Sequence, residues 1–315
     1  MPALPLFRKF SQAARRNELA WRYTFNLGPA LKFRMARTGL PAEAARVVRD
    51  LDRQGIAMIP ADKLLGESSL FAELQSAVAS LEQSLSRQLQ EARQAADDPL
   101  AGREKAFLYE LLGPRPALDP SSIFARFALS RPILQIANAY FGMYTRLRYY
   151  NVWHTFVTSG QPRQSQLWHR DREDRLILKL FVYLDDVDLE AGPLTYAPGT
   201  HLKGAIRQTP ECFQESGVWR STDEQMAAVV PRERWISAVG GKGAIVFADT
   251  HGYHKGGLAR GRDRILYTCM FTSPASESAE LLSRPKILPL PAEKELAFAL
   301  SAPKRGPLAA WRPRG

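Results

Sequence analysis

From about residue 145 to residue 273, short apolar runs alternate with turns, and this pattern limits the fold more than any other feature of the sequence. The runs are rich in β-branched and aromatic residues, which favour strands. Gly, Pro and clusters of acidic residues separate the runs, as is typical of turns. A series of short strands joined by turns predicts a β-barrel or a jelly-roll. We expect strands at residues 146–157, 176–184, 194–197, 244–247 and 265–271.

The first half of the chain has the spacing of helices instead. Pro41 precedes a periodic segment that stops at Gly55, and these residues favour a helix start and a helix end respectively. Further on, Leu and Val recur at three- and four-residue steps, which is the period of one helix face. The predicted fold is therefore mainly β, with helices before the β core. We expect helices at residues 42–54, 68–96 and 123–141, and a short buried strand at 56–59.

The net charge of +11 is concentrated at the two ends of the chain. Residues 1–38 carry +7 and residues 284–315 carry +5, so the middle is nearly neutral. We therefore expect nucleic acid not to be a partner of the core. The aromatic and basic residues near the N-terminus favour a segment that packs on the body of the protein. Peripheral contact with an anionic membrane surface, or an oligomer contact, stays open.

The cysteine content and the hydropathy pattern restrict the compartment. Cys212 and Cys269 are too few for a disulfide framework and fit a reducing compartment, so we expect a cytoplasmic protein. No apolar run approaches the roughly 18 residues that a membrane-spanning helix needs. The N-terminus lacks the apolar stretch of a secretory signal. Its continuation into patterned sequence argues against a transit peptide.

The tripeptide His169-Arg170-Asp171 carries the clearest chemistry in the chain. Alternate side chains on a strand point the same way, so His169 and Asp171 can reach one metal ion. With a distant second histidine they make a two-His-one-carboxylate set, which leaves positions open on Fe(II) for other ligands. Alone the tripeptide is a weak signal, because His-x-Asp pairs also occur as surface or hydrogen-bonded residues.

The motifs that follow make the metal site the stronger interpretation. The apolar run 176–184 is followed by Gly192-Pro193-Leu194 and then by Pro198-Gly199-Thr200-His201. In this order the motifs resemble the phytanoyl-CoA dioxygenase family of 2-oxoglutarate oxygenases, over about residues 145–273. The resemblance implies a double-stranded β-helix core (jelly-roll, cupin-like) flanked by N-terminal helices. It also implies Fe(2+), O2 and 2-oxoglutarate, the last as co-substrate.

Two histidines compete for the third metal position, His251 and His254. In the family, a glycine that opens a strand stands about eleven residues before this histidine, and Gly243 stands at that step from His254. His254 is also followed by Lys-Gly, which resembles the family's His-x-Gly ending. The resemblance therefore implies His254. His251 remains the alternative because its spacing to Arg262 fits the family better.

The family also places an arginine before the last core strand, where it binds the far carboxylate of 2-oxoglutarate. The resemblance implies Arg262, with Arg264 as the second choice. A guanidinium suits this task because it makes two parallel hydrogen bonds to a carboxylate. The competing interpretation is that both arginines are exposed cations in a loop. Lys179 lies on an apolar strand, so we expect it to reach a carboxylate of 2-oxoglutarate or of a substrate, or to extend to the sheet edge.

Together these features predict an Fe(II)- and 2-oxoglutarate-dependent dioxygenase with His169, Asp171 and His254 as catalytic metal ligands. We expect it to hydroxylate a C–H bond of a small-molecule, lipid-like or acyl-type substrate, with release of succinate and CO2. One alternative is a non-catalytic jelly-roll that binds a ligand and docks its basic ends on an anionic surface. A nucleic-acid demethylase has less support. We expect His201 to be structural and His154 to be a satisfied polar residue.

The chain is expected to contain one catalytic domain with an extension at each end. The extension at the N-terminus is basic and amphipathic, and the arm at the C-terminus is rich in Pro and Arg. The oligomeric state is left open. The predicted regions are 1–40 for the extension, 41–283 for the catalytic domain (helical at 41–144, jelly-roll at 145–273) and 284–315 for the arm.

Overall fold

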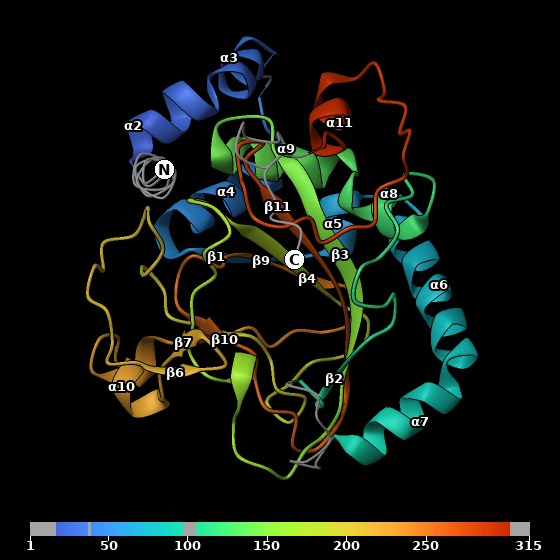
Figure 1. Cartoon of the computed structure of the whole chain (residues 1–315), viewed down its shortest axis with the longest axis vertical. Coiled ribbons are helices and arrows are strands. Elements are labelled where there is room, and N and C mark those ends of the chain that lie inside the picture. Colours follow the sequence, from blue (N-terminus) through green and yellow to red (C-terminus); the bar gives the residue numbers. More distant parts are fainter. Residues whose placement is uncertain (1–16, 37–38, 97–104, 303–315) are drawn as a thin grey trace, which may run out of the picture.

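A six-stranded antiparallel sheet forms the centre of the fold (Figure 1). The computed structural model describes residues 17–36, 39–96 and 105–302. The strand order is β1-β9-β4-β11-β3-β2, so strands that are far apart in the sequence are neighbours in the sheet. The bounds are Ile56–Pro60 for β1, Leu108–Glu110 for β2, Arg146–Thr155 for β3, Leu178–Tyr183 for β4, Ala244–Asp249 for β9 and Arg264–Thr272 for β11.

A second antiparallel sheet, in the order β10-β5-β8, packs against the first. Isolated bridges join His169 to His254 and Trp168 to Ser221, and they extend this sheet towards a two-stranded hairpin. Two packed antiparallel sheets with helices before them confirm the predicted jelly-roll core. The bounds are Thr195–Tyr196 for β5, Phe213–Glu215 for β6, Val218–Arg220 for β7, Ile236–Ser237 for β8 and His254–Lys255 for β10.

Alternating side chains give the six-stranded sheet two apolar faces. On β4, Leu178, Leu180 and Val182 belong to the core that lies against the helices. Phe181 and Tyr183 belong to a separate core between the two sheets. Burial on both faces explains the near-continuous apolar run of this strand.

Helices cover the outer face of the six-stranded sheet (Figure 1). The helix α4 packs on β1, β9 and α9, and it contributes Val47 and Leu51 to the core. Gly55 follows α4 with a φ of 83°, a left-handed conformation that glycine adopts readily. The helices are α2 Glu18–Ala20, η1 Trp21–Phe25, α3 Leu27–Ala36, α4 Ala42–Gln54, α5 Ala61–Leu65, α6 Leu70–Ser84, α7 Ser86–Ala95, α8 Ile123–Ala128, α9 Arg131–Phe141, η2 Gln164–Gln166, α10 Asp223–Ala227, η3 Arg232–Arg234 and α11 Lys294–Ala299.

Two of the expected helices are interrupted. The segment expected as one helix at 68–96 is α6 and α7, with a break at Leu85. There the Ser84 hydroxyl donates to Leu81 O at 2.8 Å and competes with the helical backbone. The segment expected at 123–141 is α8 and α9, because Ser130 is extended and a proline occupies the first turn of α9.

The described parts of both ends pack on the body of the protein. Trp21 is buried, and its Nε1 donates to Asp174 Oδ1 at 2.9 Å. Near the other end, Phe298 of α11 stacks on Tyr144 with ring centroids 5.2 Å apart, so part of the predicted arm is helical. The rest of the two predicted extensions lies outside the described residues. Membrane or oligomer contact through them stays a prediction. Within the described ranges, no helix is long and apolar enough to cross a bilayer.

Candidate metal centre

Three side chains from two segments meet in one place: His169 and Asp171 come from one segment and His254 from the other. Their ligand atoms lie within 4.8 Å of one another. A backbone pair sets up this arrangement, because His169 N donates to His254 O at 3.0 Å and His254 N donates to His169 O at 3.1 Å. Residues directly opposite on antiparallel segments share a face, and the two rings have centroids 4.3 Å apart. The structure thus brings together the three residues expected as metal ligands.

Both imidazoles are held in the tautomer that suits a metal ligand. His169 Nδ1 donates to Leu167 O at 2.8 Å, and His254 Nδ1 donates to Gly252 O at 3.0 Å. A proton on Nδ1 leaves Nε2 with a free lone pair. Burial lowers the pKa of both histidines, that of His169 well below its usual range, and so favours neutral rings. Two neutral imidazoles and a carboxylate are a donor set that fits Fe(II).

Asp171 joins the cluster as a carboxylate with a cation beside it. Lys179 Nζ lies 2.6 Å from Asp171 Oδ2, and His254 Nε2 lies 3.8 Å from the same oxygen. Burial raises the pKa of Asp171, but the neighbouring Lys179 ammonium outweighs burial and holds the pKa well below the usual range. The sequence predicted that Lys179 reaches a carboxylate of 2-oxoglutarate or of a substrate. In the structure its partner is instead the metal-ligand candidate Asp171.

His251, the alternative third ligand, lies outside the cluster of ligand atoms that the described residues form. Its backbone N donates to Asp249 Oδ1 at 3.0 Å. Burial lowers the pKa of its imidazole to about 4. His254 is thus the histidine that meets His169 and Asp171.

The remaining two histidines have structural partners. His201 is buried, and its Nε2 donates to Asp52 O at 3.2 Å. His154 lies between two carboxylates, with Nδ1 3.1 Å from Glu82 Oε1 and Nε2 2.8 Å from Asp263 Oδ2. Neither belongs to the metal-ligand cluster found in the described part of the chain.

The two candidate arginines have opposite surroundings. Arg262 has a side chain that is 48% exposed, and its Nη2 lies 2.6 Å from Asp188 Oδ2. Arg264 is buried at the start of β11, opposite Thr155 of β3. Its Nε and Nη1 have no hydrogen-bond partner among the residues described. Buried donors without acceptors are costly and rare in folded proteins, so this guanidinium is suited to receive a ligand.

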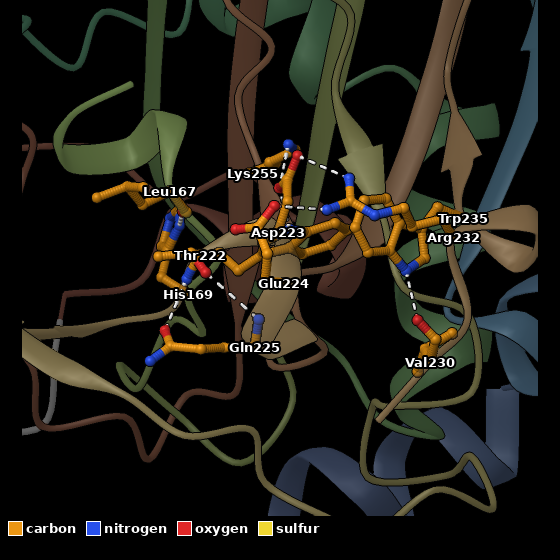
Figure 2. A network of polar contacts seen from close by, with 11 residues as sticks. Leu167, His169, Thr222, Asp223, Glu224, Gln225, Val230, Arg232, Trp235 and Lys255 are labelled. Atoms are coloured by element: carbon orange, nitrogen blue, oxygen red, sulfur yellow. Dashed lines mark hydrogen bonds and ion pairs between the residues drawn. The ribbon is translucent and has the colours of Figure 1, made fainter. Parts of the chain in front are cut away.

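A polar network holds the segments that carry His169 and His254 (Figure 2). Asp223 of α10 accepts from Trp168 Nε1 at 2.7 Å, and Lys255 Nζ lies 2.5 Å from the same carboxylate oxygen. Trp168 directly precedes His169, and Lys255 directly follows His254. One carboxylate therefore ties together both histidine-bearing segments. No local sequence pattern indicates this role, because the contact joins residues far apart in the chain.

Replacing Asp223 by alanine is expected to weaken metal binding without removing a ligand. Both histidine segments lose their shared anchor, and outer partners of metal ligands contribute about 10–100-fold to affinity. A chelator competition with Zn(II) or Fe(II) measures the change. The matched control is Glu224→Ala on the same helix, since Glu224 is 78% exposed and pairs with Arg232. Equal metal affinity in the two variants would contradict the anchoring role.

A cavity of about 420 Å³ opens beside His169 and Asp171. Part of its wall is the hairpin β6–β7, which we did not predict. The hairpin does have a sequence signal, because Ser216-Gly217 separates two short runs and both residues have positive φ, as two-residue hairpin turns need. The cationic and aromatic residues that line the cavity are Lys105, Arg170, Arg172, Trp219, Arg220 and Tyr253.

Solved structures similar to this chain include iron-containing proteins, whereas no curated protein sequence matches it. EctD from S. alaskensis with bound Fe has a TM-score of 0.50 at 16% identity, over 79% of this chain and 91% of that one. AviO1 from Streptomyces viridochromogenes Tue57 has a TM-score of 0.49 at 20% identity, over 77% of this chain and 100% of that one. The epimerase SnoN, in complex with Fe3+, α-ketoglutarate and nogalamycin RO, has a TM-score of 0.48 at 20% identity, over 85% and 97%.

The likeness to EctD supports the jelly-roll fold and nothing further. The family is established by sequence instead. The model of the phytanoyl-CoA dioxygenase family matches residues 51–264, a range that holds His169, Asp171 and His254 and ends at Arg264. This match and the converging triad support the iron and 2-oxoglutarate expected from the sequence. The chain belongs to the phytanoyl-CoA dioxygenase family.

Proposed function

We propose that this protein is an Fe(II)- and 2-oxoglutarate-dependent dioxygenase that hydroxylates a C–H bond of a small-molecule or acyl-type substrate. The observation that carries the proposal is the convergence of His169, Asp171 and His254 within 4.8 Å, with both imidazoles held for metal binding. We propose these three residues as the iron ligands. The free thiols of Cys212 and Cys269 fit the cytoplasm as the compartment.

Arg264 is the residue that we propose binds the far carboxylate of 2-oxoglutarate. It lies on the inner face of β11, in the same row as Leu266, Thr268 and Met270, and Met270 is opposite Lys179 of β4. The row therefore runs along the barrel interior towards the triad. The free donors of Arg264 match a carboxylate in geometry and charge. Arg262 pairs with Asp188 at the surface. Arg264, the second choice from the sequence, is therefore the better candidate.

The bound iron and 2-oxoglutarate supply O2 activation and the oxidation of a C–H bond, with release of succinate and CO2. The residues of this chain orient the metal ligands and exclude water from the site. Lys179 holds the Asp171 carboxylate from 2.6 Å, which keeps it charged and aimed at the cluster. Phe181 and Tyr183, with their apolar neighbours between the two sheets, exclude water from the barrel interior.

Anaerobic Fe(II) with 2-oxoglutarate should give a weak visible charge-transfer band in the purified protein, and admission of O2 should release succinate. A His169→Ala, Asp171→Ala double variant provides the control. Absence of the band in the wild type, or its persistence in the double variant, would contradict the proposal. Iron content without any succinate release would favour the alternative, a jelly-roll that binds a ligand without turnover.

A further inference from the structure

Arg220 stands next to the metal-ligand cluster but has no place in the proposed iron and 2-oxoglutarate sites. The bridge between Trp168 and Ser221 makes Arg220 the neighbour of His169 across two antiparallel segments. Neighbours of this kind project to the same side, so the Arg220 side chain lies beside the imidazole and lines the 420 Å³ cavity. Its hairpin lies at the same end of the molecule as β10, which carries His254 (Figure 1).

The Arg220 guanidinium is buried and lacks a matched anion. Its side chain is only 5% exposed, and Nε and Nη1 have no hydrogen-bond partner in the described part of the chain. The carboxylate closest to it in the ion pairs is that of Glu215, with Oε2 3.9 Å from Nε, beyond hydrogen-bond distance. The same Oε2 already accepts from Gln164 N at 2.8 Å. A charged side chain that is buried in a cavity wall with free donors calls for an acceptor in the cavity.

We infer that Arg220 binds an oxyanion of the substrate, a carboxylate or a phosphate, and so directs the reacting end of the molecule towards the cluster. The inference rests on the proposed function. One carboxylate of 2-oxoglutarate is needed at the metal, and Arg264 on the opposite sheet takes the other. Arg220 is therefore left for a third anion, and its planar donor group suits either oxyanion.

The other residues that line the cavity indicate the chemical character of the remainder of the same substrate. Arg172 lines it and is exposed to solvent, which adds positive charge at the mouth, and Glu173 is the opposing charge. Trp219 is 44% exposed on the hairpin and also lines the cavity. An exposed indole next to a charged pocket suits an aromatic or aliphatic body. The cavity volume is in the range of small-molecule sites, so a small amphiphilic anion is the expected ligand class.

The test uses 3-phenylpropionate, phenyl phosphate and the neutral 3-phenylpropanamide as probes. Isothermal titration calorimetry measures their binding to the full chain, first metal-free and then with Ni(II) and saturating 2-oxoglutarate, so that turnover does not occur. We expect at least one anion to bind at least about tenfold more tightly than the amide, because the amide offers no charge. The preferred anion tells carboxylate from phosphate substrates.

In Arg220→Gln the affinity for the preferred anion should fall at least about tenfold while that for the amide is unchanged. Arg220→Lys keeps the charge and should show an intermediate loss of affinity for the anion. This variant also keeps the test informative if the glutamine variant folds poorly. Arg207→Gln is the matched control, since Arg207 is an exposed arginine that donates to Leu202 O at 3.2 Å and does not line the cavity. It should bind the anions like the wild type.

Three outcomes would overturn the inference. These are no anion binding by the wild type in either state, unchanged anion affinity in Arg220→Gln, and an equal loss in Arg207→Gln, which would indicate a general electrostatic field and not direct contact. The anaerobic charge-transfer band measures 2-oxoglutarate binding in Arg220→Gln. If this binding is lost, Arg220 contacts the co-substrate and not the substrate. If the wild type lacks that band but binds anions through Arg220 when metal-free, the proposed function fails and the anion site stands.

Discussion

Replacing Asp171 by alanine should abolish stoichiometric iron binding and, with it, succinate formation. Asp171 is the only carboxylate in the cluster found among the described residues, so the variant leaves two neutral imidazoles to hold a divalent ion. Outer partners of metal ligands already contribute about 10–100-fold to affinity, and a charged ligand contributes more. We therefore expect affinity to fall by more than about a hundredfold, measured by chelator competition.

The same substitution leaves Lys179 without its partner, so a loss of folding must be separated from a loss of the metal. The side chains of Lys179 and Asp171 are 17% and 13% exposed, and removing one member of such a pair typically costs about 3–5 kcal/mol of unfolding free energy. Asp171→Ala, Lys179→Met removes both charges and should recover most of that stability in urea unfolding. It should still fail to bind iron. Wild-type iron content in the double variant would show that Asp171 is not a ligand.

Most elements were predictable because their signals are local. Pro41 and Gly55 mark the two ends of α4, and the apolar run at 176–184 marks β4. The break at Leu85 was missed because the helical spacing of leucines continues through it. The break at Ser130 was missed because apolar residues flank it on both sides. The Ser84 hydroxyl and the proline in the first turn of α9 act on the backbone, and the spacing of apolar residues does not reveal such effects.

Two kinds of signal predicted the site residues: the alternation of side chains along an extended segment, and the motifs of the family. His169 and Asp171 follow from the two-residue period of an extended segment, and His254 from the family spacing. The arginine could not be chosen this way, because positions 262 and 264 have the same parity. The choice depends on where β11 begins, and it begins at Arg264. Arg220 and Asp223 were missed because they meet the histidine segments only through pairing across about fifty residues.

Replacing Arg264 by glutamine should weaken 2-oxoglutarate binding roughly a hundredfold, since truncating one side of a buried charged pair costs about 2–5 kcal/mol and tenfold is about 1.4 kcal/mol. The anaerobic titration of Fe(II) protein with 2-oxoglutarate measures the change. The stability of the ligand-free protein should move little or rise. Arg264 is buried there with unmatched Nε and Nη1 donors, so the variant removes a desolvated charge that has no partner in the described structure.

Arg262→Gln is the matched control for this prediction, because it removes the same charge two residues away. Its side chain is 48% exposed and its partner is Asp188, so its loss breaks only a surface ion pair. We expect 2-oxoglutarate affinity within about twofold of the wild type, a change that weak surface pairs allow. The opposite result, with Arg262→Gln impaired and Arg264→Gln unaffected, would move the co-substrate to the barrel rim. A large fall in stability of ligand-free Arg264→Gln would instead mean that this guanidinium has a structural role.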